Sequence, residues 1–90
     1  MKKKNYVYIL KCSDGTFYTG WTTDIEARVN THNSGSGAKY TRGRRPVSLV
    51  YYEELPDRSA ALKREAAIKR LPRNKNLELI AGSSIPETKN

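Results

Sequence analysis

Short hydrophobic runs along the chain predict three β-strands. They cover residues 6–11, 16–20 and 47–52. Each run is rich in β-branched, aromatic or aliphatic residues, which pack well on a half-buried pleated surface. Only a turn signal, Ser13-Asp14-Gly15, separates the first two runs. We therefore expect these two strands to pair as a hairpin.

The length of the hairpin loop decides which side chains share a face of the sheet. A two-residue loop, Asp14-Gly15, would place Tyr8 and Tyr18 on opposite faces, because side chains alternate along a strand. A three-residue loop, Ser13-Asp14-Gly15, ends in a residue with a left-handed backbone conformation. Gly15 occupies that position, and glycine adopts this conformation readily. We favour the longer loop, which puts both tyrosines on one face. In the simplest alternative they are ordinary strand aromatics.

One helix and a basic loop are expected between the hairpin and the third strand. Thr23 and Glu26 have the spacing of a capping box, in which each side chain satisfies a free backbone N–H group. The helix is expected over residues 24–33, where a run of serine and glycine stops it. Residues 39–45 form the loop, and Pro46 closes it.

Two further helices follow the third strand. Asp57 and Ser59 are candidate N-caps for a helix over residues 60–71, which Pro72 ends. A short helix over residues 74–81 completes the chain. The order β-β-α-β-α-α indicates an α+β fold, with a three-stranded antiparallel sheet flanked by helices.

The length of 90 residues fits one domain. We assign residues 1–82 to this domain and expect residues 83–90 to form a flexible polar tail. Cys12 is the one cysteine, so no intrachain disulfide or cysteine zinc cluster is expected. No apolar run is long enough to cross a membrane, and the first one is too short for a secretory signal. The cytoplasm is the expected compartment.

Positive charge favours a nucleic-acid partner. The sequence has 17 Lys and Arg against 9 Asp and Glu, a formal net charge of +8. Such an excess binds phosphate backbones through counterion release. The expected nucleic-acid-binding residues lie in the basic loop: Lys39, Tyr40, Arg42, Arg44 and Arg45. The alternative is a basic protein whose charge only keeps it soluble.

Two candidate functional residues lie on the first predicted helix. Arg28 and His32 are four residues apart, so they are neighbours on one helix face. Arg28 can hold a phosphate with two hydrogen bonds. His32 is the single histidine, and its side chain can exchange protons near neutral pH. In the plainer interpretation this face is solvated and Arg28 pairs with nearby acids.

Glu65 is the third candidate, on the second predicted helix. Ala61, Leu62 and Ile68 lie within about 60° of it on a helical wheel, so its carboxylate should face the protein body. A carboxylate in that position needs a positive partner. Lys69, one turn away, and a divalent metal ion are both open possibilities.

Taken together, these residues resemble the GIY-YIG nuclease family. The first family motif is similar to Tyr6-Val7-Tyr8, with Tyr6 in place of glycine, and the second to Tyr18-Thr19-Gly20, with threonine in place of isoleucine. The helical arginine, the following histidine and the glutamate of the family match Arg28, His32 and Glu65. Residues 38–46 resemble the small stand-alone bacterial branch of this family. Trp21 is a departure from the pattern.

The resemblance implies a one-metal endonuclease that hydrolyses DNA. The catalytic residues would be Tyr8, Tyr18, Arg28, His32 and Glu65, and Glu65 would hold one Mg²⁺ or Mn²⁺. In this scheme Tyr18 is the leading general base, His32 takes or relays the proton, Tyr8 hydrogen-bonds within the site, and Arg28 grips the phosphate.

Two other functions remain open. A non-catalytic nucleic-acid-binding module could keep the fold and the basic loop. In an accessory or protein-interaction domain the exposed charge would serve only solubility. DNA is the expected partner, with RNA as the alternative. A role in DNA repair or recombination, a separate targeting protein and a monomeric state are further expectations. No membrane partner is expected.

Overall fold

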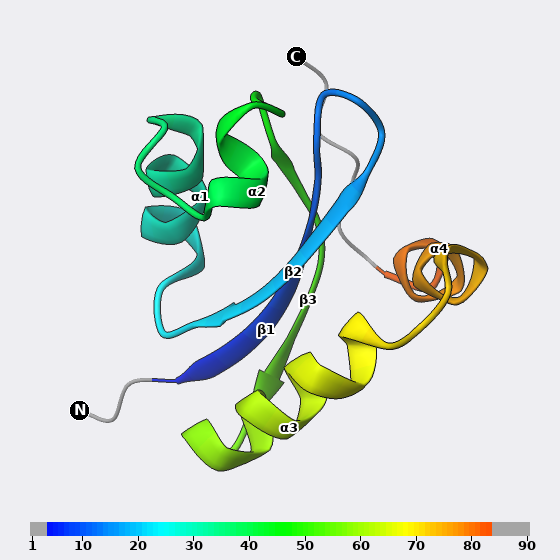
Figure 1. The fold of residues 1–90 in the computed structure, drawn as a ribbon. Helices are drawn as coiled ribbons and strands as arrows, with labels where there is room; N and C mark the ends of the chain where they lie inside the picture. Colours follow the sequence, from blue (N-terminus) through cyan, green and yellow to red (C-terminus); the bar gives the residue numbers. More distant parts are fainter. Residues whose placement is uncertain (1–3, 84–90) are drawn as a thin grey trace.

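The computed structural model describes residues 4–83. Within this range three strands form one antiparallel sheet, shown in Figure 1. The strands are β1 (Asn5–Lys11), β2 (Phe17–Thr22) and β3 (Ser48–Leu55), in the spatial order β2-β1-β3. The α+β prediction is confirmed, and β2 lies at one edge of the sheet.

The hairpin has the predicted three-residue loop. Tyr8 pairs with Gly20, and Leu10 pairs with Tyr18. Gly15 closes the loop with φ of +84°, in the left-handed region that glycine adopts without strain. The register therefore places Tyr8 and Tyr18 on one face of the sheet, as expected.

The first helix forms where it was predicted, but its N-cap differs. α1 spans Ile25–Asn33, and Asp24 caps it by accepting a hydrogen bond from the Ala27 N–H group at 3.1 Å. The predicted capping box is wrong, because Thr23 precedes the cap by one residue. At the other end, the Asn33 side chain bridges to Val47, accepting from its N–H at 2.7 Å and donating to its carbonyl at 3.0 Å.

The segment predicted as a basic loop contains one additional helical turn. α2 spans Lys39–Arg42 and is followed by Gly43. This short helix packs against α1 on the same side of the sheet, as Figure 1 shows. Four residues of polar sequence carry no periodic pattern, so this turn gave no sequence signal.

Both later helices match the prediction closely. α3 spans Arg58–Lys69 and α4 spans Arg73–Ala81. Asp57, one of two candidate caps, accepts a hydrogen bond from the Ala60 N–H group at 2.8 Å. The expected tail over residues 83–90 lies, apart from Ser83, outside the described residues.

Two hydrophobic clusters cover the two faces of the sheet. Val7 and Ile9 pack with Ile68 of α3 on one face. Tyr8 and Leu10 pack on the other face, against the side that carries α1 and α2. Figure 1 accordingly shows α1 and α2 on one side of the sheet and α3 and α4 on the other, with β2 between them. In residues 4–83 no helix is long and apolar enough to cross a membrane.

Candidate active site

One cleft gathers all five residues predicted to be catalytic. Its volume is about 380 Å³. The residues that line it are Tyr8, Tyr18, Gly20, Trp21, Thr22, Thr23, Arg28, His32, Ala38 and Glu65. A larger groove of about 650 Å³ lies between α1 and β3, but none of the five predicted residues lines it. We therefore regard the smaller, more polar cleft as the candidate active site.

The edge position of β2 explains how Glu65 reaches the tyrosines. Tyr8 and Tyr18 belong to the face that carries α1, whereas Glu65 comes from α3 on the opposite face. Because no further strand lies beyond β2, side chains from both faces meet around its edge. The cleft is thus built from both sides of the sheet, and strand order is what brings the two sides together.

A hydrogen-bond chain fixes His32 at the buried end of the cleft. The Tyr8 hydroxyl lies 3.1 Å from Nε2 of His32, and the Thr41 Oγ1 lies 2.8 Å from Nδ1. The Thr41 hydroxyl donates its one proton to the carbonyl oxygen of Ala38 at 2.9 Å. With this proton on the Ala38 carbonyl, Thr41 accepts from His32, and we accordingly assign the proton of the neutral imidazole to Nδ1.

The protonation states of Tyr8 and His32 follow from this arrangement. Since Nδ1 carries the proton, Nε2 accepts from the Tyr8 hydroxyl. Burial, and then the nearby charge of Arg28, lower the pKa of His32 below its ordinary value of 6.5. Burial is also the main reason that the pKa of Tyr8 is raised well above its ordinary value, and Tyr18 adds to this effect. At neutral pH the pair is a phenol and a neutral imidazole.

Two glycines allow these side chains to approach the backbone closely. A Cβ atom on Gly20 would lie 2.5 Å from the Tyr8 hydroxyl oxygen. A Cβ atom on Gly37 would lie 2.4 Å from Nδ1 of His32 and 2.8 Å from its Cα. Any other residue at either position would displace the hydrogen-bond chain. The glycine of the Tyr18-Thr19-Gly20 motif therefore has a steric role beside Tyr8.

Tyr18 lies next to this chain without a hydrogen bond to it. Its ring is tilted against the His32 ring at a centroid distance of 5.2 Å. Its other neighbours are the Tyr40 ring, stacked at 5.9 Å, and the Lys69 ammonium, 6.0 Å from the ring centroid. Tyr18 is thus held by aromatic and cation–π contacts, at the wall of the cleft.

Glu65 makes the ion pair that was one of the two open possibilities. Its Oε2 lies 3.1 Å from Nζ of Lys69, and its side chain is 16% exposed. Ala61 and Ile68 beside it are fully buried, as expected, whereas Leu62 is 40% exposed and does not belong to the core. Glu65 is therefore at the boundary between the core and the cleft, and the buried stripe is narrower than the wheel predicted.

The donor set of the cleft fits a hard divalent cation. Mg²⁺ is often held by one or two carboxylates, with water and substrate phosphate completing its shell. Glu65 supplies a carboxylate, and the cleft leaves room for water and a phosphate. Among residues 4–83 no group of three or more His, Cys, Asp or Glu side chains could hold a metal ion. Any ion at Glu65 would depend on ligands from water and substrate.

Arg28 is exposed on α1 and lines the cleft. Within residues 4–83 the structure gives it no ion pair with an acid, so the interpretation of a paired surface arginine finds no support there. Its charge acts on both Tyr8 and His32. A guanidinium at the mouth of a polar cleft is placed to bind an anion.

Most arginines of the basic segment have structural contacts of their own. Arg42 and Arg45 donate to the carbonyl oxygens of Gly37 and Asn33, at 3.3 Å each. Arg44 pairs with Asp14 at 3.0 Å and lies 4.0 Å above the centre of the Tyr40 ring. These guanidinium groups hold the segment in place, and their charges still face solvent.

Sequence reasoning missed Thr41, the residue that orients His32. Thr41 is fully buried and lies nine residues from His32. Its position inside the small unpredicted helix α2 explains the omission. Trp21 was left without a role. It lines the cleft, packs against the core on the α3 side, and lies beneath the Arg58 guanidinium at 5.6 Å from its ring centre.

Comparison with known proteins agrees with this fold and cleft. The model of the GIY-YIG catalytic domain matches residues 4–78. The chain belongs to the GIY-YIG family, which is a family of nuclease domains.

Its relatives include small proteins of similar length. A UPF0213 protein of Clostridium perfringens is 57% identical over 83 residues, covering 92% of this chain and 89% of its own. A UPF0213 protein of Syntrophus aciditrophicus is 60% identical over 78 residues, covering 86% and 90%. The solution NMR structure of the UPF0213 protein of Bacillus halodurans has a TM-score of 0.60 at 46% identity, covering 92% of this chain and 88% of that one. None of these names states a specific activity.

Proposed function

We propose that this protein is a metal-dependent endonuclease that hydrolyses phosphodiester bonds of DNA. The observation that carries the proposal is the convergence of Glu65, Arg28 and the Tyr8–His32–Thr41 chain on one cleft. An acid that can hold a cation, a guanidinium and a proton acceptor are the groups that such hydrolysis needs. A binding module would have no need to orient a buried imidazole.

Each group has a role in the proposed reaction. Arg28 binds the scissile phosphate and stabilises the charge that develops on its oxygens. Glu65 would hold one Mg²⁺ or Mn²⁺, which when bound neutralises charge on the phosphate and on the leaving oxygen. Lys69, whose Nζ lies 3.1 Å from Oε2 of Glu65, is a second cation beside this carboxylate.

The attacking water must lose a proton as its oxygen forms the new bond to phosphorus. Tyr18 remains the leading general base, in keeping with the family resemblance. On this route Tyr18 takes the water proton while its own hydroxyl proton passes to solvent, because the described residues give it only a ring contact with His32. The hydrogen bond between Tyr8 and His32 supports a second route, in which Tyr8 receives the water proton and passes its own to Nε2. Both routes break the bond from phosphorus to the leaving oxygen, which takes a proton from solvent. Comparing Tyr18→Phe with Tyr8→Phe would separate them.

DNA is the proposed substrate, and RNA is the alternative that a substrate comparison would reveal. The net charge of +8 predicts that binding weakens steeply with salt. We further propose that the protein is a cytoplasmic monomer. It would act in DNA repair or recombination and would be directed to its substrate by a separate protein.

The first prediction tests Glu65. Purified protein is incubated with supercoiled plasmid and branched DNA in Mg²⁺, in Mn²⁺ and in EDTA. We expect cleavage with either metal and none in EDTA. Glu65→Ala should abolish cleavage, whereas Glu78→Ala should not, because Glu78 pairs with Lys75 on exposed α4 and does not line the cleft. Circular dichroism checks that both variants fold.

The outcomes separate the candidate functions. An active Glu65→Ala protein would refute the metal-binding role of this carboxylate. If no DNA is cut under any condition but DNA binds with a strong salt dependence, the protein is a binding module. If DNA neither binds nor is cut, the basic surface has another purpose.

A further inference from the structure

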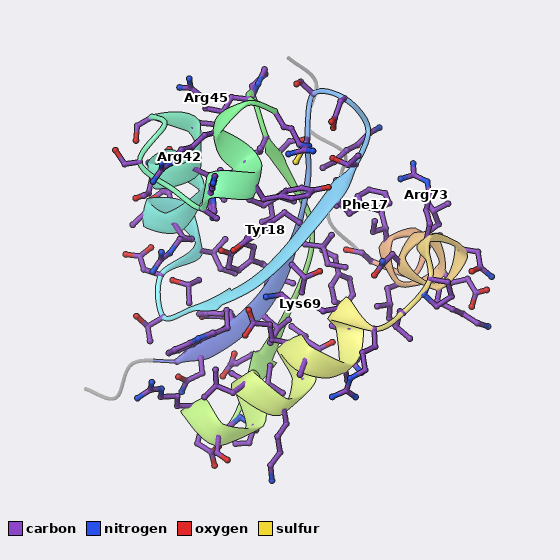
Figure 2. The ribbon with its side chains drawn as sticks, in the orientation of Figure 1. Phe17, Tyr18, Arg42, Arg45, Lys69 and Arg73 are labelled. Carbon is purple, nitrogen blue, oxygen red and sulfur yellow. The ribbon has the colours of Figure 1, made fainter. Side chains whose placement is uncertain are left out.

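A second hollow lies beside the candidate active site along the edge of β2. Its volume is about 300 Å³. The residues that line it are Phe17, Tyr18, Thr19, Tyr40, Ile68, Lys69 and Asn76. Tyr18 lines both hollows, so the second begins where the first ends. Figure 2 shows Phe17, Tyr18 and Lys69 gathered around β2, with Arg73 of α4 beyond Phe17.

This hollow combines aromatic rings with positive charge. Lys69 Nζ lies 6.0 Å from the centre of the Tyr18 ring, and the Arg73 guanidinium lies 4.7 Å from the centre of the Phe17 ring. Tyr40, which lines the hollow, is 39% exposed to solvent. Rings for stacking together with cations for phosphates are how proteins bind single-stranded nucleic acid.

Asn76 adds a polar side chain to the wall of the hollow. Its Oδ1 is covered by protein and has no hydrogen-bond partner within the described residues, so the part of the amide that can meet a ligand lies elsewhere on the side chain. An acidic peptide would use the cations but would leave the rings of the hollow unused.

We propose that this hollow is a subsite for one unpaired nucleotide adjacent to the linkage that is cut. Its base packs against the rings of Phe17 and Tyr18 and takes the place of the Arg44 guanidinium over the Tyr40 ring, and its phosphates contact Lys69 and Arg73. A base that is still paired in a duplex is stacked between its neighbours and does not enter. The substrate would therefore be single-stranded or branched DNA with an unpaired base at this position. The inference rests on the proposed function for the neighbouring cleft.

The test measures binding in EDTA, where no cleavage is needed. The probe is a DNA with one unpaired 2-aminopurine at a branch, compared with a fully paired duplex of the same sequence. We expect the wild-type protein to bind the branched probe more tightly and to quench its fluorescence, because stacking quenches this base. Stacking on an aromatic side chain is worth about 1–3 kcal/mol per base, which is roughly a 5- to 150-fold change in affinity.

A pair of exposed tyrosines supplies a matched control. Tyr40→Ala should lower affinity for the branched probe within that range and remove the quenching, whereas Tyr40→Phe keeps the ring and should retain both. Tyr52 is 46% exposed but lies on β3 and lines the other groove, so Tyr52→Ala should behave like wild type. Circular dichroism and binding to the paired duplex show whether each variant is folded and still binds DNA.

The result can refute the subsite without refuting the nuclease. Equal affinity for branched and paired probes, or equal effects of Tyr40→Ala and Tyr52→Ala, would overturn the subsite while Mg²⁺-dependent cleavage stands. Conversely, quenching that depends on Tyr40 in a protein that cuts no DNA would support the subsite and reject the proposed hydrolysis.

Discussion

At the scale of single residues, the state of His32 depends on one buried hydroxyl. Thr41 cannot donate to the imidazole, because its proton is already engaged by Ala38. This constraint sets the tautomer, and the tautomer in turn decides that Tyr8 donates its proton to His32. A residue that was not among the predicted site residues therefore controls how two predicted catalytic residues face each other.

Thr41→Val should disturb this tautomer while keeping the shape of the side chain. The Nδ1–H group would lose its acceptor, at a cost of about 1–3 kcal/mol, and cleavage should fall by roughly 10- to 100-fold. Thr41→Ser retains the hydroxyl and should restore both. The ¹⁵N shifts of the imidazole report the tautomer directly, and His32 is the single histidine of the chain. An unchanged tautomer in Thr41→Val would contradict the assignment.

Residue patterns revealed most of the candidate site, because the positions of these residues depend on local secondary structure. Tyr8, Tyr18, Arg28, His32 and Glu65 each have a position that strand alternation or helical spacing defines. Thr41 could not be found in this way. Its contact with His32, nine residues away, joins two different helices, and no periodic pattern records such a contact.

At the scale of elements, the two helices that carry predicted site residues, α1 and α3, each begin at a capping aspartate. α3 carries Glu65 and begins at Asp57, whose side chain caps it. The strands and helices were predictable because their hydrophobic patterns are clear. The short helix α2 was not predictable from a pattern. The N-cap of α1 lies one residue later than predicted, because Thr23 and Asp24 are both good caps and only tertiary structure selects one of them.

Asp57→Ala should destabilise the protein by about 1 kcal/mol, because it leaves an N–H group at the start of α3 without its acceptor. For a domain of this size that corresponds to a fall in melting temperature of about 4–8 °C. Ser59→Ala is the matched control, since Ser59 was the other candidate cap and makes no capping contact in the structure. Thermal melts followed by circular dichroism compare the two. Equal melting temperatures for both variants would remove Asp57 from this role.

At the scale of the whole molecule, burial of a neutral histidine links stability to pH. The unfolded chain would bind a proton at His32 with a pKa of about 6.5, whereas the folded protein lowers that pKa. Between these two values the unfolded state binds more protons, so the free energy of unfolding decreases as the pH falls.

Urea denaturation at pH 7.5 and pH 5 should therefore show lower stability at the acid pH. Most carboxylates titrate below about pH 4.3 and contribute little in this window. In His32→Gln the difference in stability between the two pH values should be smaller. If that variant does not fold, an NMR titration of the wild-type imidazole gives the same information. Identical urea midpoints at both pH values, or an imidazole pKa above 6.5, would contradict the buried neutral state.

The cleft around the edge of β2 has a practical consequence for handling the protein. Its two halves rest on separate hydrophobic clusters, one on each face of the sheet, and local opening of either cluster costs less than complete unfolding. Heat or storage would then separate the halves of the cleft while most of the helical signal survives. A preparation that looks intact by circular dichroism can therefore have lost the cleft.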